Sequence, residues 1–209
     1  IKAAVLREKA DLGIIFDTDV DRMSAVLADG SGINRNALIG IMAAILAPEY
    51  PGSTIVTDSI TADRLTDFLE KKLGLRHHCF KRGYKNVINE AIRLNQEGIV
   101  SPLAIETSGH GALKENYFLD DGAYMAVRLL AAAAKAATRR ARLDTLLTGY
   151  TAACVEAEIR IPIAGDGFGE YGKNVLAVFK TRAVEQGITV LESYEGVRLR
   201  YENGWAMLR

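Results

Sequence analysis

The chain has 209 residues, of which 49% are hydrophobic and 25% are charged, and this composition excludes a disordered or low-complexity protein. Lys and Arg together number 26, as do Asp and Glu, so the formal net charge is zero. A neutral chain lacks the basic surface that nucleic acid or an anionic membrane requires, so neither is expected as a partner, and any anion must bind at a local site.

The two cysteines, Cys79 and Cys154, lie far apart in the sequence and form no CxxC pair. This spacing indicates free thiols in a reducing compartment. The longest apolar run, residues 131–134 with neighbouring leucines, is too short to span a bilayer, and no secretory leader is visible. We therefore expect a cytoplasmic protein and, because the first residue is Ile1 rather than Met, a fragment of a longer one.

Helical and strand patterns alternate along the first two thirds of the chain. Helices are predicted over residues 2–9, 36–47, 61–72, 84–95 and 121–137. Strands are predicted over residues 12–16, 23–28, 54–57, 76–80 and 99–105. Strands and helices that alternate with short connections predict an α/β layer structure.

The pattern changes after Thr151, so we place a domain boundary near Gly149. One helix is predicted here, over residues 171–186, among strands over 154–161, 188–191, 196–201 and 205–208. One helix among several strands predicts an α+β unit.

An acidic loop, DTDVDR at residues 17–22, directly follows the apolar run 12–16. We expect it at the carboxyl end of a strand, where open α/β sheets bind ligands. Asp17, Asp19 and Asp21 alternate, so an extended loop points all three to one side. Three converging carboxylates repel one another unless a cation is present, and their hard oxygens suit Mg²⁺ or Ca²⁺. The alternative is a solvated acidic turn.

Three kinds of metal loop are compatible with these aspartates at first sight. An EF-hand is excluded, because its sixth and twelfth positions would be Arg22 and Ala28 rather than Gly and Glu. A haloacid-dehalogenase-like phosphatase matches FDTDV, with Asp17 as nucleophile and residues 120–121 as a distal acidic pair. The third kind uses the whole of DTDVDR, including Asp21 and Arg22.

A second polar loop, ETSGH at residues 106–110, also follows a predicted strand. Glu106, Ser108 and His110 supply a carboxylate, a hydroxyl and an imidazole, which are groups that bind the vicinal hydroxyls of a sugar. The alternative is a polar loop without a ligand.

A cationic cluster, KRGYK at residues 81–85, lies between a predicted strand and a predicted helix. Helix N-termini and basic side chains both favour phosphate, whereas the alternative is a solvated basic turn. His77 and His78 have no acidic neighbours in the sequence, so we expect surface or edge residues rather than ligands.

Together these segments resemble the α-D-phosphohexomutases, the phosphoglucomutase/phosphomannomutase superfamily. DTDVDR is similar to the family's D-G-D-G-D-R metal loop, KRGY at 81–84 to its K-x-G-H segment, and ETSGH to its G-E-x-S-G-H sugar loop. LKENYFLDDGAY at 113–124 is similar to F-K-E…D-D-G, and EGVR at 195–198 and NGWAMLR at 203–209 resemble the strands before the R-x-S-x-T-x-P phosphate loop. The resemblance covers nearly the whole chain.

Three substitutions and one absence distinguish the chain from the family pattern. Val20 and Ile105 stand where the family has glycine, and Tyr84 stands where it often has histidine. No segment resembles the family's T-A-S-H-N-P loop, which carries the nucleophilic serine. We therefore expect a fragment that lacks the N-terminal phosphoserine domain and the C-terminal phosphate loop.

The resemblance implies the end of one α/β domain, a complete three-layer α/β domain, and a truncated α+β domain with a TATA-box-binding-protein-like fold. Residues 1–35 would be the C-terminal part of domain II with the metal loop. Residues 36–148 would be domain III with the sugar-binding loop, and residues 149–209 an incomplete domain IV.

The resemblance also implies a mutase that moves a phosphoryl group between C1 and C6 of a hexose, through a phosphoserine and a bisphosphorylated sugar. The partners would be a hexose phosphate or bisphosphate, and the fragment alone would be inactive. In this family pattern Mg²⁺ would be bound by Asp17, Asp19 and Asp21, and the phosphoryl group or the sugar would be contacted by Arg22. The sugar hydroxyls would be held by Glu106 and Ser108, while Lys81 and His110 would lie near the reacting oxygens. The distal phosphate would be bound by Arg209. Two alternatives stay open: the phosphatase with Asp17 as nucleophile, and a non-catalytic phosphosugar-binding module.

Overall fold

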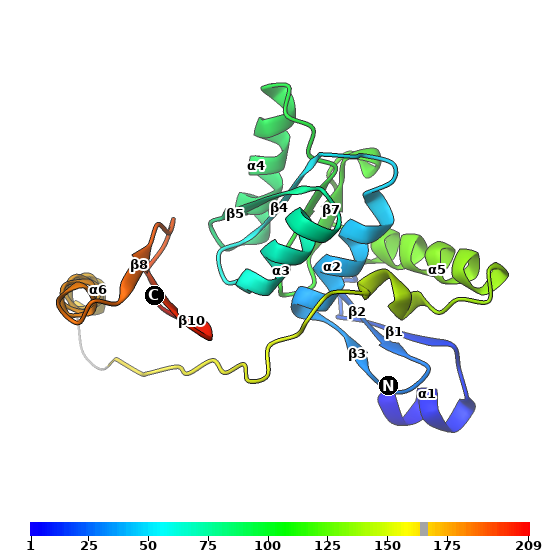
Figure 1. The fold of residues 1–209 in the computed structure, drawn as a ribbon, viewed down its shortest axis with the longest axis horizontal. Coiled ribbons are helices and arrows are strands. Elements are labelled where there is room, and N and C mark those ends of the chain that lie inside the picture. The colour runs from blue at the N-terminus through cyan, green and yellow to red at the C-terminus, as the bar shows by residue number, and fades with distance from the viewer. Residues whose placement is uncertain (164–166) are drawn as a thin grey trace. The chain divides into compact units, whose positions relative to one another are not determined.

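A computed structural model describes residues 1–163 and 167–209 of the chain (Figure 1). The described residues form two compact units, Ile1–Ala152 and Ala153–Arg209, and each is presented by itself. No helix of the described residues is long and apolar enough to cross a membrane.

The first unit begins with a helix and a small antiparallel sheet in the order β1-β2-β3. The bounds are α1 Lys2–Glu8, β1 Leu12–Phe16, β2 Met23–Leu27 and β3 Gly32–Ile33. Phe16 pairs with Met23, so residues 17–22 form the loop of a β-hairpin. The loop lies at the carboxyl end of a strand, as expected, but that strand belongs to an antiparallel hairpin and not to an open parallel sheet.

A larger, mostly parallel sheet follows, in the order β5-β4-β6-β7. Its bounds are β4 Thr54–Asp58, β5 Arg76–Phe80, β6 Leu103–Ile105 and β7 Gly111–Leu113. β4 runs parallel to β5 and β6, whereas β7 returns antiparallel to β6. The carboxyl ends of three strands therefore meet at one edge of the sheet, which is where open α/β sheets bind ligands.

Helices cover both faces of this sheet, so the three-layer α/β class is confirmed (Figure 1). The helical segments are α2 Arg35–Leu46, α3 Asp63–Asp67, the π-helix η1 Phe68–Lys72, α4 Tyr84–Gln96, the 3₁₀ turns η2 Lys114–Asn116 and η3 Leu143–Leu147, and α5 Gly122–Thr138. On one face, Val87 and Ala91 of α4 pack on Val56 and Ala104. The other face packs on α2 and α5.

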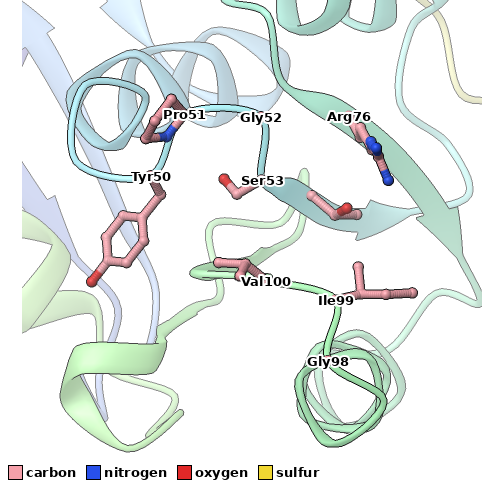
Figure 2. Close-up of a pocket in the computed structure, with 9 residues that line it drawn as sticks. Tyr50, Pro51, Gly52, Ser53, Arg76, Gly98, Ile99 and Val100 are labelled. Carbon is pink, nitrogen blue, oxygen red and sulfur yellow. The ribbon is translucent and has the colours of Figure 1, made fainter.

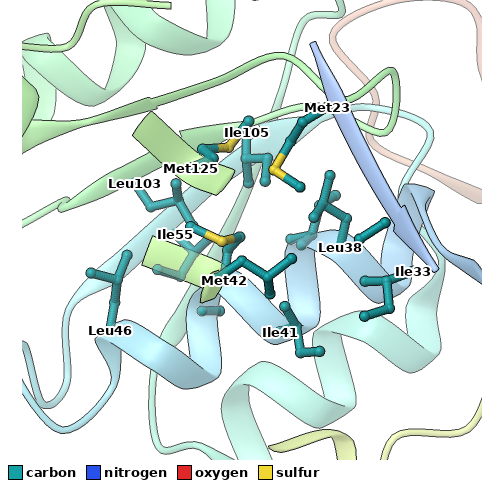
Figure 3. Close-up of a cluster of buried hydrophobic side chains, with 14 of the residues drawn as sticks. Met23, Ile33, Leu38, Ile41, Met42, Leu46, Ile55, Leu103, Ile105 and Met125 are labelled. Atoms are coloured by element: carbon teal, nitrogen blue, oxygen red, sulfur yellow. The ribbon is translucent and has the colours of Figure 1, made fainter. Parts of the chain in front are cut away.

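One hydrophobic cluster joins the two sheets of the first unit (Figure 3). Leu38 and Met42 of α2 lie in it beside Ile55 of β4, and none of the three is exposed. Met23 of β2 and Ile33 of β3 enter the same cluster, with 3% and 1% of their surface exposed. Each buried side chain of this size contributes about 1.5–3 kcal/mol. The hairpin that carries the acidic loop is therefore anchored to the larger sheet.

The second unit contains α6 Phe168–Glu185 and the antiparallel strands β8 Thr189–Leu191, β9 Val197–Tyr201 and β10 Gly204–Leu208. Ala183, Val197 and Leu199 form its small core. The strand predicted over residues 154–161 is wrong, because these residues are exposed and form neither helix nor strand. An alternating pattern becomes a strand only where a neighbouring strand accepts its backbone hydrogen bonds.

Candidate functional site

The acidic loop brings its three aspartates together. Each of Asp17, Asp19 and Asp21 offers a carboxylate oxygen, and these oxygens lie within 4.8 Å of one another. Among the described residues, Oδ1 of Asp21 is buried and accepts no hydrogen bond. Three converging carboxylates, one of which also has a buried oxygen without a hydrogen bond, fit the requirements of Mg²⁺.

Arg22 supplies the balancing charge inside this loop. Its Nε donates to Asp17 Oδ2 at 2.6 Å, and its backbone N–H donates to Asp17 Oδ1 at 3.2 Å. Desolvation alone would raise the pKa of Asp17, but the hydrogen bonds and charge of Arg22 outweigh it and hold that pKa below its ordinary value. Asp17 is therefore an ionised carboxylate at neutral pH.

The backbone of the acidic loop is strained at Val20, whose φ is +65°. This left-handed region favours glycine, and a β-branched residue adopts it at a cost of about 1–2 kcal/mol. The loop is held in this shape from α5, because the Gly122 N–H donates to the Val20 carbonyl at 3.1 Å. A Cβ on Gly122 would lie 2.8 Å from that oxygen, so only glycine allows the approach.

The second loop, residues 106–110, connects β6 to β7 and is largely buried. Glu106 is 4% exposed, and its Oε1 accepts the Gly83 N–H at 2.5 Å. Its Oε2 accepts the hydroxyl of Ser108 at 3.1 Å, while Ser108 itself is exposed. The predicted sugar-binding carboxylate thus sits in a fixed orientation between two donors.

Asp58, which sequence reasoning missed, supports this loop from beneath. Asp58 is the fully buried last residue of β4, and its Oδ2 accepts the Thr107 hydroxyl at 2.6 Å and the Thr107 N–H at 3.3 Å. Burial raises the pKa of Asp58 to about 6, and the nearby charge of Glu106 adds to this effect, while the Thr107 hydrogen bonds oppose it. The sequence feature that could have identified Asp58 is its position at the end of the β-branched run TIVTD.

The two loops lie side by side because their backbones pair. Arg22 and His110 form an isolated antiparallel bridge, and the Met23 N–H donates to the Gly109 carbonyl at 3.2 Å. Gly109 has a φ of +101°, and a Cβ there would lie 2.7 Å from the carbonyl oxygen of Met23. This junction requires glycine at position 109 for both reasons.

His110 occupies the centre of the combined site. Its Nδ1 lies 2.8 Å from Asp120 Oδ2 and 3.6 Å from Asp21 Oδ2, so it faces acids from both sides. The ring of Tyr84 stacks on the imidazole at a centroid distance of 4.9 Å. Desolvation by burial raises the pKa of Asp120 above its ordinary value. The contacts from Asp120 and Tyr84 were not anticipated from the sequence.

Two of the predicted residues are not brought into these contacts. Lys81 is exposed in the short connection between β5 and α4, two residues before Gly83. Arg209 is the last residue of the second unit, which is described by itself.

A hollow of about 410 Å³ lies at the opposite end of the parallel strands, where β4 and β5 begin (Figure 2). Ser53 and Arg76 line it, together with Ile99 and Val100. None of the residues of the two loops contributes to it. The hollow is therefore separate from the candidate site.

Known proteins match both the sequence and the fold. A sequence model of phosphoglucomutase/phosphomannomutase alpha/beta/alpha domain III matches residues 34–151. The phosphomannomutase/phosphoglucomutase of Pseudomonas putida is 31% identical over 208 residues, which are 99% of this chain and 42% of that protein. The crystal structure of a phosphoglucomutase/phosphomannomutase family protein from Burkholderia thailandensis has a TM-score of 0.78 at 25% identity and covers 99% of this chain and 41% of its own.

A more distant structure shares the fold alone. N-acetylphosphoglucosamine mutase from Aspergillus fumigatus, solved in complex with GlcNAc-6P and magnesium, is 17% identical with a TM-score of 0.51, covering 66% of this chain and 32% of that one. The chain spans less than half the length of these relatives. Because the domain III model extends over more than half of its residues, the chain belongs to the phosphoglucomutase/phosphomannomutase family.

Proposed function

We propose that the chain provides the metal site and the sugar site of a phosphohexomutase, which transfers a phosphoryl group between C1 and C6 of a hexose through a phosphoserine and a bisphosphorylated intermediate. The observation that carries this proposal is the backbone pairing of Arg22 with His110. This pairing puts the cation-binding carboxylates next to the loop suited to sugar hydroxyls, as phosphoryl transfer to a sugar requires.

In this proposal Asp17, Asp19 and Asp21 hold one Mg²⁺, whose charge offsets that of the phosphoryl group in transfer. The support is the convergence of three carboxylates, one of which, Asp21, also has a buried oxygen without a hydrogen bond. Arg22 contacts the phosphoryl or the sugar, and its ion pair with Asp17 holds the guanidinium beside the carboxylates.

Glu106 accepts hydrogen bonds from sugar hydroxyls, and Ser108 donates or accepts them, in either orientation of the hexose. Glu106 is suited to this because both of its oxygens are already held in place. His110 exchanges a proton with the reacting hydroxyl at Nε2 while Asp120 holds the proton on Nδ1. Lys81 is a phosphate contact or a proton donor, and Arg209 belongs to the distal phosphate clamp.

The same proposal assigns residues 1–35 to the end of domain II, 36–148 to domain III and 149–209 to part of domain IV. The phosphoryl-donating serine lies outside these 209 residues, so the chain alone does not turn over a hexose phosphate. Support comes from the domain III match over residues 34–151 and from the absence of a T-A-S-H-N-P-like segment in the sequence.

The phosphatase alternative is not retained. An attacking aspartate needs a carboxylate oxygen that is free to reach phosphorus, and open α/β sheets bind their ligands at the carboxyl ends of parallel strands. Asp17 instead follows an antiparallel strand, and both of its oxygens accept hydrogen bonds from Arg22.

Titration calorimetry with MgCl₂ tests the metal site. The chain should bind one Mg²⁺, Asp19→Asn should weaken binding severalfold, and Asp11→Asn, an exposed aspartate before β1, should not. Asp19 makes no contact with Arg22 comparable to that of Asp17, so its loss should not perturb the loop. Equal affinity of all three proteins would remove the carboxylates from the proposal.

NMR titration with glucose 1-phosphate, mannose 1-phosphate and glucosamine 6-phosphate tests the sugar site. Shifts should concentrate at residues 106–110, and Glu106→Gln should weaken binding, whereas Glu97→Gln on the exposed end of α4 should not. In parallel, a coupled mutase assay on the chain alone should show no turnover. Measurable turnover would contradict the assignment of the nucleophile to residues outside the chain.

A further inference from the structure

A polar cluster around Cys79 lies on the face of β5 that packs on α3, apart from the two loops of the candidate site. His77 and Cys79 alternate along β5 and therefore point to the same side of the sheet. Thr57 lies opposite Cys79 on the neighbouring strand β4, and Thr66 comes from α3. The histidine and the cysteine are both partly exposed, so small solutes reach the cluster.

The distances between the cysteine, histidine and threonine side chains of this cluster suit the activation of the cysteine as a nucleophile. Cys79 Sγ lies 3.5 Å from His77 Nε2, which also lies 2.7 Å from the Thr57 hydroxyl oxygen. On the other side of the ring, His77 Nδ1 lies 2.7 Å from the Thr66 hydroxyl oxygen. A nucleophile, a base within reach and a third group that orients the base form the arrangement that activates serine and cysteine in many enzymes. Cys79 is thus part of a Cys–His–Thr set rather than an isolated thiol.

Two further hydroxyls surround the sulfur. The Thr57 hydroxyl donates to Cys79 Sγ at 3.8 Å, and the Thr61 hydroxyl oxygen lies 3.1 Å from the same atom. Hydroxyl donors and a neighbouring imidazolium both favour a thiolate over a thiol. Glu70, from the π-helical segment, accepts the backbone N–H of His77 at 3.3 Å, and a carboxylate in this neighbourhood favours a protonated imidazole.

We propose that Cys79 is a reactive cysteine, held as a thiolate beside protonated His77, and that it is a modification site for peroxides and soft electrophiles. With hydrogen peroxide, the thiolate sulfur attacks one peroxide oxygen and the O–O bond breaks. Sulfur is oxidised by two electrons to a sulfenic acid, which keeps the proton of the attacked peroxide oxygen, and the departing hydroxide takes the proton of His77 to form water. This site lies beyond the proposed mutase function, and its test requires no hexose phosphate.

The chain contains its own controls. Cys154 is an exposed free thiol in the second unit, so it reports the reactivity of an ordinary cysteine. His78 is the neighbour of His77 but points to the other face of β5, where it pairs with Glu90 at 2.9 Å. Glu90 is an acidic partner that His78 acquires only in the fold, since no acidic residue lies beside it in the sequence.

The first experiment compares the alkylation of Cys79, in Cys154→Ser, with that of Cys154, in Cys79→Ser. Iodoacetamide is added between pH 5 and 9, and the adduct is followed by intact-mass spectrometry. At pH 6 Cys79 should react about tenfold faster or more, although it is the less exposed thiol, because its thiolate persists at lower pH. A Cys79 rate below that of Cys154 at every pH would overturn the proposal.

The second experiment places His77→Gln, His78→Gln and Thr66→Val in the Cys154→Ser background. His77→Gln should abolish the excess rate at pH 6, Thr66→Val should lower it severalfold, and His78→Gln should leave it unchanged. Dimedone trapping after hydrogen peroxide should label Cys79 in the parent and fail in His77→Gln. Circular dichroism checks folding, and Thr66→Val decides the matter if His77→Gln does not fold. Rates unaffected by both substitutions, or lowered equally by His78→Gln, would contradict the role of His77.

Discussion

The acidic loop, residues 17–22, and the loop at residues 106–110, called the sugar loop after its proposed ligand, differ in one respect. They differ in how completely other groups of the chain satisfy the hydrogen bonds and charges of their side chains. In the sugar loop, Glu106 and Thr107 are buried and hydrogen-bonded to Gly83, Ser108 and Asp58. In the acidic loop, three carboxylates share one arginine, and Val20 holds a strained backbone.

This difference indicates that the two loops are preorganised for ligand binding to different degrees. A loop whose polar groups are already held has little to lose in conformational entropy when a ligand binds. A loop with crowded carboxylates and backbone strain gains further stability when a cation binds. The sugar loop is therefore preorganised for its proposed ligand, whereas we expect a bound cation to complete the acidic loop.

The largest expected effect comes from breaking the junction between the loops with Gly109→Ala. The new Cβ would lie 2.7 Å from the Met23 carbonyl oxygen, at a φ of +101°. We expect a loss of about 2–4 kcal/mol in the free energy of unfolding, measured with urea. Gly98→Ala is the matched control, because φ is +83° there but no atom lies within 4 Å, and it should cost about 1–2 kcal/mol. Equal losses would show that the junction is not tightly packed.

The next effect concerns Asp58, the buried residue that accepts hydrogen bonds from Thr107 of the sugar loop, and it depends on pH. The pKa of Asp58 is raised from 3.8 to about 6 in the folded chain, so its contribution to stability is fully present below pH 3.8 and is lost as pH rises through 6. Relative to Asp58→Asn, the parent should lose roughly 2–3 kcal/mol between pH 4 and pH 7. Urea unfolding of both proteins at several pH values measures this difference. A constant difference across that range would mean that Asp58 titrates normally.

A smaller effect tests whether a cation completes the acidic loop. At ten times its dissociation constant, Mg²⁺ should add about 1.4 kcal/mol to the stability of the parent chain, because it binds only the folded loop. Thermal unfolding with MgCl₂ and with EDTA measures this gain. Asp19→Asn should lose most of it, and Asp29→Asn, in the turn between β2 and β3, should retain it. An undiminished gain in Asp19→Asn would place the ion elsewhere.

The smallest effect concerns the strain at Val20. Val20→Gly should raise stability by up to about 1 kcal/mol, since relief of the left-handed conformation exceeds the entropy that glycine adds to the unfolded chain. Val20→Ala keeps a Cβ and should gain less. Differential scanning calorimetry compares the three proteins, and a lower melting temperature for Val20→Gly would show that Val20 is not strained.

Local patterns predicted most of the fold because each element carries its own periodicity. β1 and β5 have the predicted bounds, and α2, α4 and α5 agree within one or two residues. β3 and β7 were missed, because strands of two and three residues are too short to show alternation. The run over 99–105 contains only the short strand β6, because pairing with β4 begins at Leu103.

The candidate site likewise has features that the local sequence predicted and contacts that only the fold produced. DTDVDR and ETSGH were recognisable as chemistry from residue types and spacing alone, since carboxylates at alternate positions and a Glu-x-Ser-x-His set are local features. Asp58, Tyr84 and the pairing of His110 with Asp120 were not predicted, because each acts through a contact with a separate segment.

The sequence by itself determined the class of the fold, the family, and the two polar loops with their residue chemistry. The tertiary structure alone decided that Arg22 pairs with His110, that Gly83 donates to Glu106, and that Thr66 of α3 contacts His77. The first two contacts join residues far apart in the chain, and the third depends on which face of β5 is covered. Sheet order and packing produce all three, and the periodicity of a single segment carries no information about its neighbours.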